Sequence, residues 1–202
     1  EKQFQAIEWH ISYNYNFLME SLNNNYFSNK NKILSTITSS NYSLSGHIDR
    51  LNLLKYLDDN HFEIDIFGKI FENNVGGQLL KSLKNYKGEI RGHCHISGAS
   101  GSYKELGLEN YKYHLCCENS YEKGYFTEKF VDPILCECLI FYDGCININE
   151  IINPMAFIKI NIKNKEETLK IIETAIKNNE WEKRINYIKE AKYKILNELH
   201  FI

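Results

Sequence analysis

The chain has 202 residues, 43% of them hydrophobic and 25% charged, and a formal net charge of −2 at pH 7. A chain of this size buries one substantial core, and its near-neutral charge argues against the broad basic surface that binds nucleic acid or anionic lipid. We therefore expect one globular domain without a nucleic-acid partner, in which any anionic ligand binds in a local pocket.

The first 30 residues carry no pattern typical of a membrane span or a signal peptide. No run of about 18 apolar residues occurs in the chain, and the start, Glu1-Lys2-Gln3-Phe4, has neither an initiator Met nor a charged stretch followed by an apolar one. We expect no transmembrane segment in this chain. We interpret residues 1–30 as a linker or as the tail of a preceding domain.

Residues 31–202 alternate apolar runs of strand length with helical patterns, which is typical of a parallel sheet covered by helices. The first half predicts a strand at 33–38, a helix at 45–58, a strand at 62–67 and a short helix at 78–83. Residues 91–110 contain several Gly and Ser and show little periodicity, so they predict mainly a loop with one helical turn.

The second half repeats the alternation. It predicts strands at 111–117, 138–142 and 157–162, and helices at 127–136, 165–178 and 180–199. The fold class is therefore α/β, a Rossmann-like parallel sheet flanked by helices. Ligands of such sheets bind at the carboxyl ends of the strands, which places residues 118–129 at a binding crevice.

The six cysteines lie mostly in apolar runs, where a free cysteine behaves as a small core residue. This favours a reducing compartment, and we expect a cytoplasmic protein with unbridged thiols. His93-Cys94-His95 and Cys136-x-Cys138 bring ligand-type side chains together, but neither has the spacing of a zinc site, so we expect no bound metal. His114 in an apolar strand is interpreted as a hydrogen-bonded core residue. Trp181, Ile185, Ile188 and Tyr193 are interpreted as a packing stripe.

Two short motifs carry the chemistry: Cys117-Glu118-Asn119-Ser120 and Gly124-Tyr125-Phe126-Thr127-Glu128-Lys129. Here a polar loop after a buried strand meets a helix N-terminus, where unpaired backbone N–H groups favour an anion and Thr127 can cap the helix. Lys129 adds a positive charge, Asn119 adds neutral donors, and Glu128 can accept from sugar hydroxyls. A pyrophosphate fits this arrangement, but an ordinary capped, solvated first turn has the same residues.

The stretch 113–129 closely resembles the pattern of glycosyltransferase family 10, the α1,3-fucosyltransferases: Tyr-Lys-Phe-x-Leu-x-Phe-Glu-Asn-Ser, a short loop, then Gly-Tyr-Val-Thr-Glu-Lys. Looser similarity extends to residues 32–40 with Arg50, to 153–158 and to Trp9-x-x-Ser12-Tyr13. The resemblance implies the C-terminal, donor-binding half of a GT-B enzyme. It also implies inverting, metal-independent transfer from GDP-fucose to a glycan acceptor, with no further cofactor.

By position, the resemblance implies that Arg50 and Lys129 contact the pyrophosphate and that Asn119 contacts a phosphate. It implies that Tyr125 lines the nucleotide site and that Glu128, the candidate catalytic residue, binds ribose or lies near the anomeric carbon. We expect Arg50 and Lys129 to be partly exposed.

The sequence also departs from the family pattern. Cys117 replaces a Phe, and no residue matches the family's general base. A non-catalytic nucleotide-sugar-binding module is therefore the alternative function. A weaker alternative is a Rossmann domain that binds another nucleotide. If that nucleotide were a dinucleotide, we would expect a Gly-x-Gly-x-x-Gly turn, which the sequence lacks. A Golgi lumen location is the alternative if a membrane anchor precedes residue 1.

Overall fold

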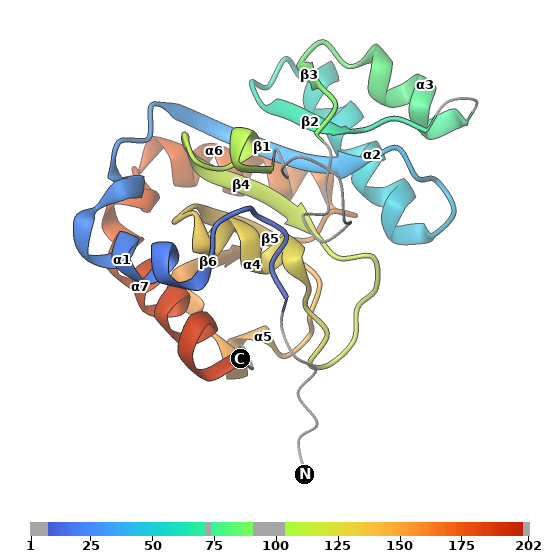
Figure 1. Cartoon of the computed structure of the whole chain (residues 1–202). Helices are drawn as coiled ribbons and strands as arrows, with labels where there is room; N and C mark the ends of the chain where they lie inside the picture. The colour runs from blue at the N-terminus through green and yellow to red at the C-terminus, as the bar shows by residue number, and fades with distance from the viewer. Residues whose placement is uncertain (1–7, 72–73, 91–103, 200–202) are drawn as a thin grey trace.

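A computed structural model describes residues 8–71, 74–90 and 104–199 of the chain. They form a six-stranded, all-parallel sheet with helices on both faces, in the strand order β3-β2-β1-β4-β5-β6 (Figure 1). The strands are β1 (Lys32–Ser39), β2 (Asp65–Lys69), β3 (Tyr86–Gly88), β4 (Tyr111–Cys117), β5 (Leu139–Asp143) and β6 (Phe157–Lys159). The predicted α/β class is confirmed.

Seven α-helices lie in the described part of the chain: α1 (Tyr15–Asn24), α2 (Ser45–Asp59), α3 (Val75–Ser82), α4 (Glu128–Leu135), α5 (Ile148–Ile151), α6 (Lys165–Lys177) and α7 (Glu180–Lys194). Short turns occur at η1 (Tyr26–Ser28), η2 (Lys104–Gly107) and η3 (Pro154–Ala156), and α7 continues into a π-helical turn, η4 (Ile195–Leu199). None of these helices has the length and apolar character needed to cross a membrane.

The strand order places a switch point between β1 and β4. The chain leaves β1 toward β2 and β3 on one side, and it leaves β4 toward β5 and β6 on the other. The connections after these two adjacent strands therefore diverge at their carboxyl ends, which is where open α/β sheets bind ligands. The strands at this point are buried on both faces, as parallel strands require, and the Tyr113 and Phe141 rings stack at 5.7 Å between β4 and β5.

The strand at 111–117, the helix that follows residue 127 and the helical turn within 91–110 are confirmed, while residues 91–103 lie outside the described part. The strand predicted at 62–67 lies at 65–69 instead, because a left-handed turn at His61 leaves Phe62 in the connection and the register pairs Ser35 with Asp65. The strand predicted at 157–162 ends at Lys159.

The interpretations of His114 and of the Trp181 stripe as core residues are confirmed in part. His114 is buried, and its Nδ1 lies 2.8 Å from the Ser35 hydroxyl, so its interpretation as a hydrogen-bonded core residue is confirmed. Trp181 and Ile188 are buried against the core, but Tyr193 is half exposed, so it is wrong to count it in the packing stripe.

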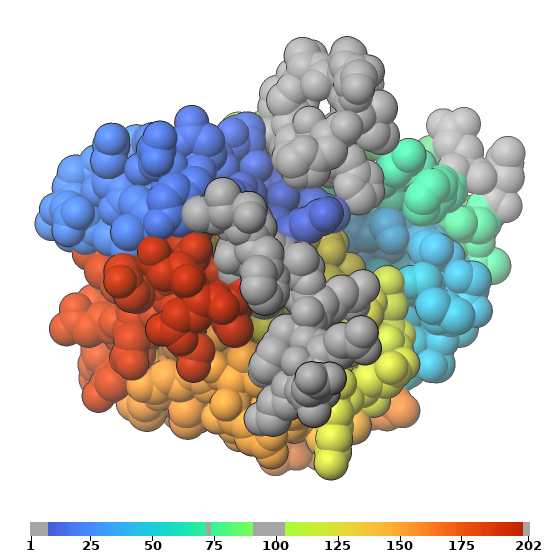
Figure 2. Space-filling view, turned by 60° about the horizontal axis from the view of Figure 1, so that its bottom comes forward, coloured from blue at the N-terminus to red at the C-terminus, as the bar shows by residue number. Residues whose placement is uncertain are grey.

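The segment before β1 packs on the end of the chain. Helix α1 contacts α7, and Figure 2 shows the N-terminal segment in blue beside the C-terminal helices in red. Buried Lys192 on α7 donates to the Ser21 hydroxyl at 2.6 Å and to the Glu137 carboxylate at 2.8 Å, which joins α1, α7 and the turn after α4. Residues 8–13 extend from α1 across the front of α4, so they reach the binding crevice.

Candidate functional site

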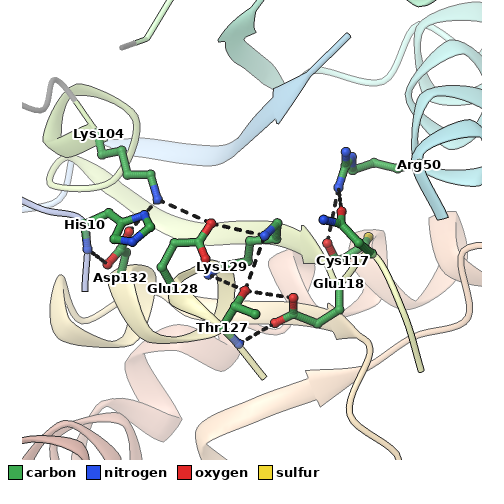
Figure 3. A network of polar contacts seen from close by, with 10 residues as sticks. His10, Arg50, Lys104, Cys117, Glu118, Thr127, Glu128, Lys129 and Asp132 are labelled. Atoms are coloured by element: carbon green, nitrogen blue, oxygen red, sulfur yellow. Dashed lines mark hydrogen bonds and ion pairs between the residues drawn. The ribbon is translucent and has the colours of Figure 1, made fainter. Parts of the chain in front are cut away.

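The N-terminus of α4 is fixed by the carboxylate that follows β4. Glu118 is fully buried, and its two oxygens accept from Thr127, one from the backbone N–H and one from the hydroxyl, each at 2.8 Å (Figure 3). The Thr127 hydroxyl oxygen in turn accepts from the Lys129 N–H at 3.3 Å and caps the helix. Burial raises the pKa of Glu118, although the Lys129 charge and the Thr127 hydrogen bonds oppose this. The first turn of α4 is thereby held at the switch point.

Arg50 reaches the same point from α2. Its Nη1 lies 3.4 Å from the Cys117 carbonyl and 3.5 Å from the Asn119 side-chain oxygen, both long hydrogen bonds. Its Nε has no hydrogen-bond partner among the described residues. Arg50 is only 5% exposed, so the expectation of partial exposure is wrong: its guanidinium lies against the end of β4 and the Asn119 side chain. Burial lowers the pKa of this guanidinium, and the neighbouring Cys117 and Glu118 oppose the shift.

Lys129 is partly exposed, as expected. One quarter of its side chain is accessible. Its Nζ lies 3.1 Å from Glu128 Oε1 and 3.3 Å from the Thr127 hydroxyl. Burial alone would raise the pKa of Glu128, but the charges of Lys129 and Lys104 outweigh burial and hold it at about 2. Glu128 is therefore an ionised hydrogen-bond acceptor across the physiological range.

A second group of charges, not found from the sequence, lies one helical turn further along α4. Lys104 of η2 donates to Asp132 Oδ2 at 2.6 Å and lies 3.9 Å from Glu128 Oε1 (Figure 3). The backbone N–H of His10 donates to Asp132 Oδ1 at 2.8 Å. Burial raises the pKa of Asp132 to about 6, although Lys104 and His10 act in the opposite direction. Glu128 and Asp132 are four residues apart in a predicted helix, and this spacing indicates that the two side chains lie on the same face of the helix.

The charged side chains of Arg50, Lys129, Glu128, Lys104 and Asp132 line one cavity of about 370 Å³ at the carboxyl ends of β1, β2 and β4. Its charged lining residues are four basic side chains and two acidic ones: Arg50, Lys69, Lys104 and Lys129, with Glu128 and Asp132. The cavity thus has an excess of two positive charges, while the whole chain has a net charge of −2. Asn119 also lines it, whereas half-buried Tyr125 is not among the described lining residues.

The described residues include no group of three or more His, Cys, Asp or Glu arranged to hold a metal ion. Cys136 and Cys138 are buried free thiols, as are Cys116, Cys117 and Cys145. His93, Cys94 and His95 lie outside the described part of the chain. Among the described residues, the cavity offers an anion the four cationic side chains and the Asn119 amide, next to the α4 N-terminus.

Comparison with known proteins gives consistent results. Residues 27–196 match the family model "Glycosyltransferase family 10 (fucosyltransferase) C-term". A curated α-(1,3)-fucosyltransferase from Helicobacter pylori is 33% identical over 66 residues, which is 32% of this chain and 14% of the relative.

Solved structures share the fold. A glycosyltransferase from Rickettsia africae matches with a TM-score of 0.53 and 16% identity, over 96% of this chain and 52% of its own. An α1,3-fucosyltransferase with GDP matches with a TM-score of 0.50 and 19% identity, over 82% of this chain and 45% of its own. An α1,3-fucosyltransferase with GDP-fucose matches with a TM-score of 0.50 and 17% identity, over 85% of this chain and 50% of its own. The chain spans about half the length of these structures and a smaller share of the curated relative.

Proposed function

Because the chain belongs to glycosyltransferase family 10, we propose that it binds GDP-fucose, or a related GDP-sugar, for transfer of the sugar to a carbohydrate acceptor. The observation that carries this proposal is the positively charged cavity at the strand switch point, next to the capped N-terminus of α4. A nucleoside diphosphate has the opposite charge, and a helix N-terminus adds backbone N–H donors to the site. The structural neighbours with GDP and GDP-fucose support the choice of donor.

In this proposal Arg50 and Lys129 bind the diphosphate, and Asn119 donates to a phosphate oxygen. Among the described residues, the Nε of buried Arg50 has no partner and its Nη1 hydrogen bonds are long. These contacts support its role, because a guanidinium with few close partners gains most from an anion. Glycosyl transfer leaves negative charge on the departing GDP, and fixed cations stabilise that charge as a divalent metal does elsewhere. We therefore propose metal-independent transfer. Inversion at the anomeric carbon stays an expectation from the resemblance to family 10.

We assign Glu128 to binding rather than to proton transfer. A general base works best when its pKa lies near the working pH, and the lysines hold the pKa of Glu128 at about 2. An ionised carboxylate beside the diphosphate site is suited to accept hydrogen bonds from ribose or sugar hydroxyls. The base that deprotonates the acceptor is then a different group. The role of Tyr125 in the nucleotide site stays a prediction.

The weak basicity of Glu128 also favours a second candidate, a nucleotide-sugar-binding module without catalysis. Both candidates bind the donor, and they differ only in turnover with an acceptor. The position of the cavity does not distinguish them, since the same cations serve binding and leaving-group stabilisation.

Calorimetric titration tests the common part of both candidates. We expect GDP and GDP-fucose to bind, UDP and dTDP-sugars to bind at least about tenfold more weakly, and EDTA to leave the affinities unchanged, because the cations of the protein meet the diphosphate directly. Loss of binding on chelation, or tight binding of UDP-sugars without binding of GDP, would contradict the proposed donor site.

A further inference from the structure

We propose that Lys104 is a positioning residue of the donor site: anchored by Asp132, it supplies the positive charge that keeps Glu128 ionised and in place once a diphosphate lies beside Lys129. The inference rests on the proposed function, because it concerns how the site accommodates the charge of its donor. It assigns a role to a residue of η2 that lies outside both sequence motifs.

The geometry makes Lys104 a bridge between two carboxylates of one helix face. Its Nζ is 2.6 Å from Asp132 Oδ2 and 3.9 Å from Glu128 Oε1 (Figure 3). Glu128 and Asp132 lie one turn apart on α4, and the side chains of Asp132 and Lys104 are 2% and 11% exposed. The shorter contact fixes the ammonium group, because the buried Asp132 carboxylate also accepts from the His10 backbone and has little freedom to move.

Donor binding changes the charge around Glu128. In the structure described here, Glu128 Oε1 has Lys129 at 3.1 Å as its nearest cation. A diphosphate at Lys129 brings two to three negative charges next to this carboxylate and shares the lysine charge, so it favours protonation or displacement of Glu128. Lys104 approaches the carboxylate from η2, on the side of Asp132, and its charge offsets this effect.

The other charged groups facing Glu128 do not replace Lys104. They are Lys129 and Asp132 on α4, Glu118 after β4, Arg50 on α2 and His10 in the N-terminal segment. Glu118 and Asp132 repel a carboxylate, and in the proposed function Arg50 and Lys129 are engaged by the diphosphate. A positive charge on His10 favours the ionised form of Glu128, so protonation of His10 cannot cause the loss of the Glu128 charge at low pH.

The alternative is that Lys104 only ties η2 to α4. Two variants separate these roles. Lys104→Gln keeps a donor for Asp132 but has no charge, and the pair Lys104→Met with Asp132→Asn removes both charges and leaves no unpaired buried carboxylate. Lys104→Arg keeps the charge and serves as the rescue variant. Lys112→Met, at an exposed pair with Glu182 remote from the cavity, is the matched control.

The experiment is GDP titration at pH 8 and pH 5 with each folded variant. For each variant, the GDP affinity at pH 5 is divided by that at pH 8, and the result is divided by the same ratio for the unsubstituted chain, so that protonation of GDP itself cancels. A ligand that raises the pKa of a carboxylate binds together with a proton and gains affinity as the pH falls. We therefore expect this relative ratio to rise by about threefold or more for Lys104→Gln and for the double variant, and by less than about twofold for Lys104→Arg and Lys112→Met.

An unchanged ratio in both uncharged variants overturns the proposal and leaves Lys104 as a structural tie. If only the double variant keeps its ratio, the proposal is equally overturned, because that variant also lacks the charge. Failure of the unsubstituted chain to bind GDP is a different outcome, which contradicts the proposed function itself.

Discussion

Gly46 in the first turn of α2 lies directly against the backbone of Asn119: a β-carbon at Gly46 would be 2.7 Å from the Asn119 carbonyl oxygen. Non-bonded carbon and oxygen atoms do not approach so closely, so any other residue at this position has to displace the loop after β4. The close approach of two backbones is what places Asn119 and the Arg50 side chain of α2 at one cavity.

Gly46→Ala is therefore expected to lower GDP affinity by about tenfold or more, and to reduce the free energy of unfolding by about 1 to 3 kcal/mol, as overpacking does. Ser45→Ala, at the exposed neighbouring position, is the control and should change neither quantity appreciably. Calorimetric titration and urea unfolding measure the two effects. Wild-type GDP affinity in Gly46→Ala would show that the position of this loop does not matter for the donor.

Arg50→Met is expected to separate binding from stability. The guanidinium is buried, its hydrogen bonds are long and its Nε is unpartnered among the described residues, so its removal should change the free energy of unfolding by less than about 1 kcal/mol. GDP affinity should fall by about tenfold to a hundredfold, the range for a charge-assisted hydrogen bond. Arg184→Met, outside the cavity, should leave GDP affinity intact. Severe unfolding of Arg50→Met with unchanged affinity per folded molecule would make Arg50 a structural residue instead.

Thr127→Ala removes both the cap of α4 and one hydrogen bond to Glu118. We expect a loss of about 1 to 2 kcal/mol in the free energy of unfolding, the usual cost of an N-cap, together with weaker GDP binding. Thr127→Ser keeps the hydroxyl and should retain most of both. Equal stability of the two variants in urea unfolding would show that the hydroxyl does not hold the helix.

Ionised Glu128 is expected to make the stability of the fold depend on pH in the acid range. Its folded pKa of about 2 lies below the ordinary 4.5, so its contribution is fully present above pH 4.5 and is lost as the pH falls toward 2. Between pH 7 and pH 3 the free energy of unfolding of the unsubstituted chain should fall by about 2 kcal/mol more than that of Glu128→Gln. Glu122→Gln, at an exposed position, is the control and should lose as much as the unsubstituted chain. Parallel pH profiles of the unsubstituted chain and Glu128→Gln would contradict the pairing of Glu128 with the lysines.

Turnover distinguishes the transferase from the binding module. With GDP-fucose and an N-acetyllactosamine-type acceptor, we expect these 202 residues to release GDP no faster than background hydrolysis, because the cavity holds the donor side of the reaction and Glu128 is a weak base. GDP release and glycan mass are the measurements. Acceptor-dependent release of GDP would place a general base within the chain. Glu8 and Glu20, acidic residues of the segment before β1, would then be the first to substitute.

Much of the fold was predictable from the sequence because its central strands are continuous apolar runs. Strand β4 was predicted at its observed bounds, since Tyr111–Cys117 is buried on both faces and ends at the polar Glu118. Helix α1 was not predicted, because only Leu18 and Ser21 of its residues are buried and it packs on α7, which is far away in the sequence. Strand β2 begins later than predicted, because the chain turns at His61. This residue has a left-handed backbone conformation, but no glycine marks the turn in the sequence.

The candidate site was predictable where its residues are adjacent in sequence. Asn119, Thr127, Glu128 and Lys129 follow one strand and begin the next helix, so one motif describes them. The Lys104 bridge was not predictable, because residues 10, 104 and 132 meet only through the tertiary fold. Burial of Arg50 was also missed, since it depends on how closely Gly46 lets α2 approach the loop after β4.

A crystal structure of the chain with GDP, grown in the presence of EDTA, would show how the donor is held. We expect the diphosphate in the cavity at the α4 N-terminus, with phosphate oxygens within hydrogen-bond distance of Arg50, Lys129 and Asn119 and no metal between them. A diphosphate bound outside this cavity, or held there without contact to either Arg50 or Lys129, would contradict the proposed donor site.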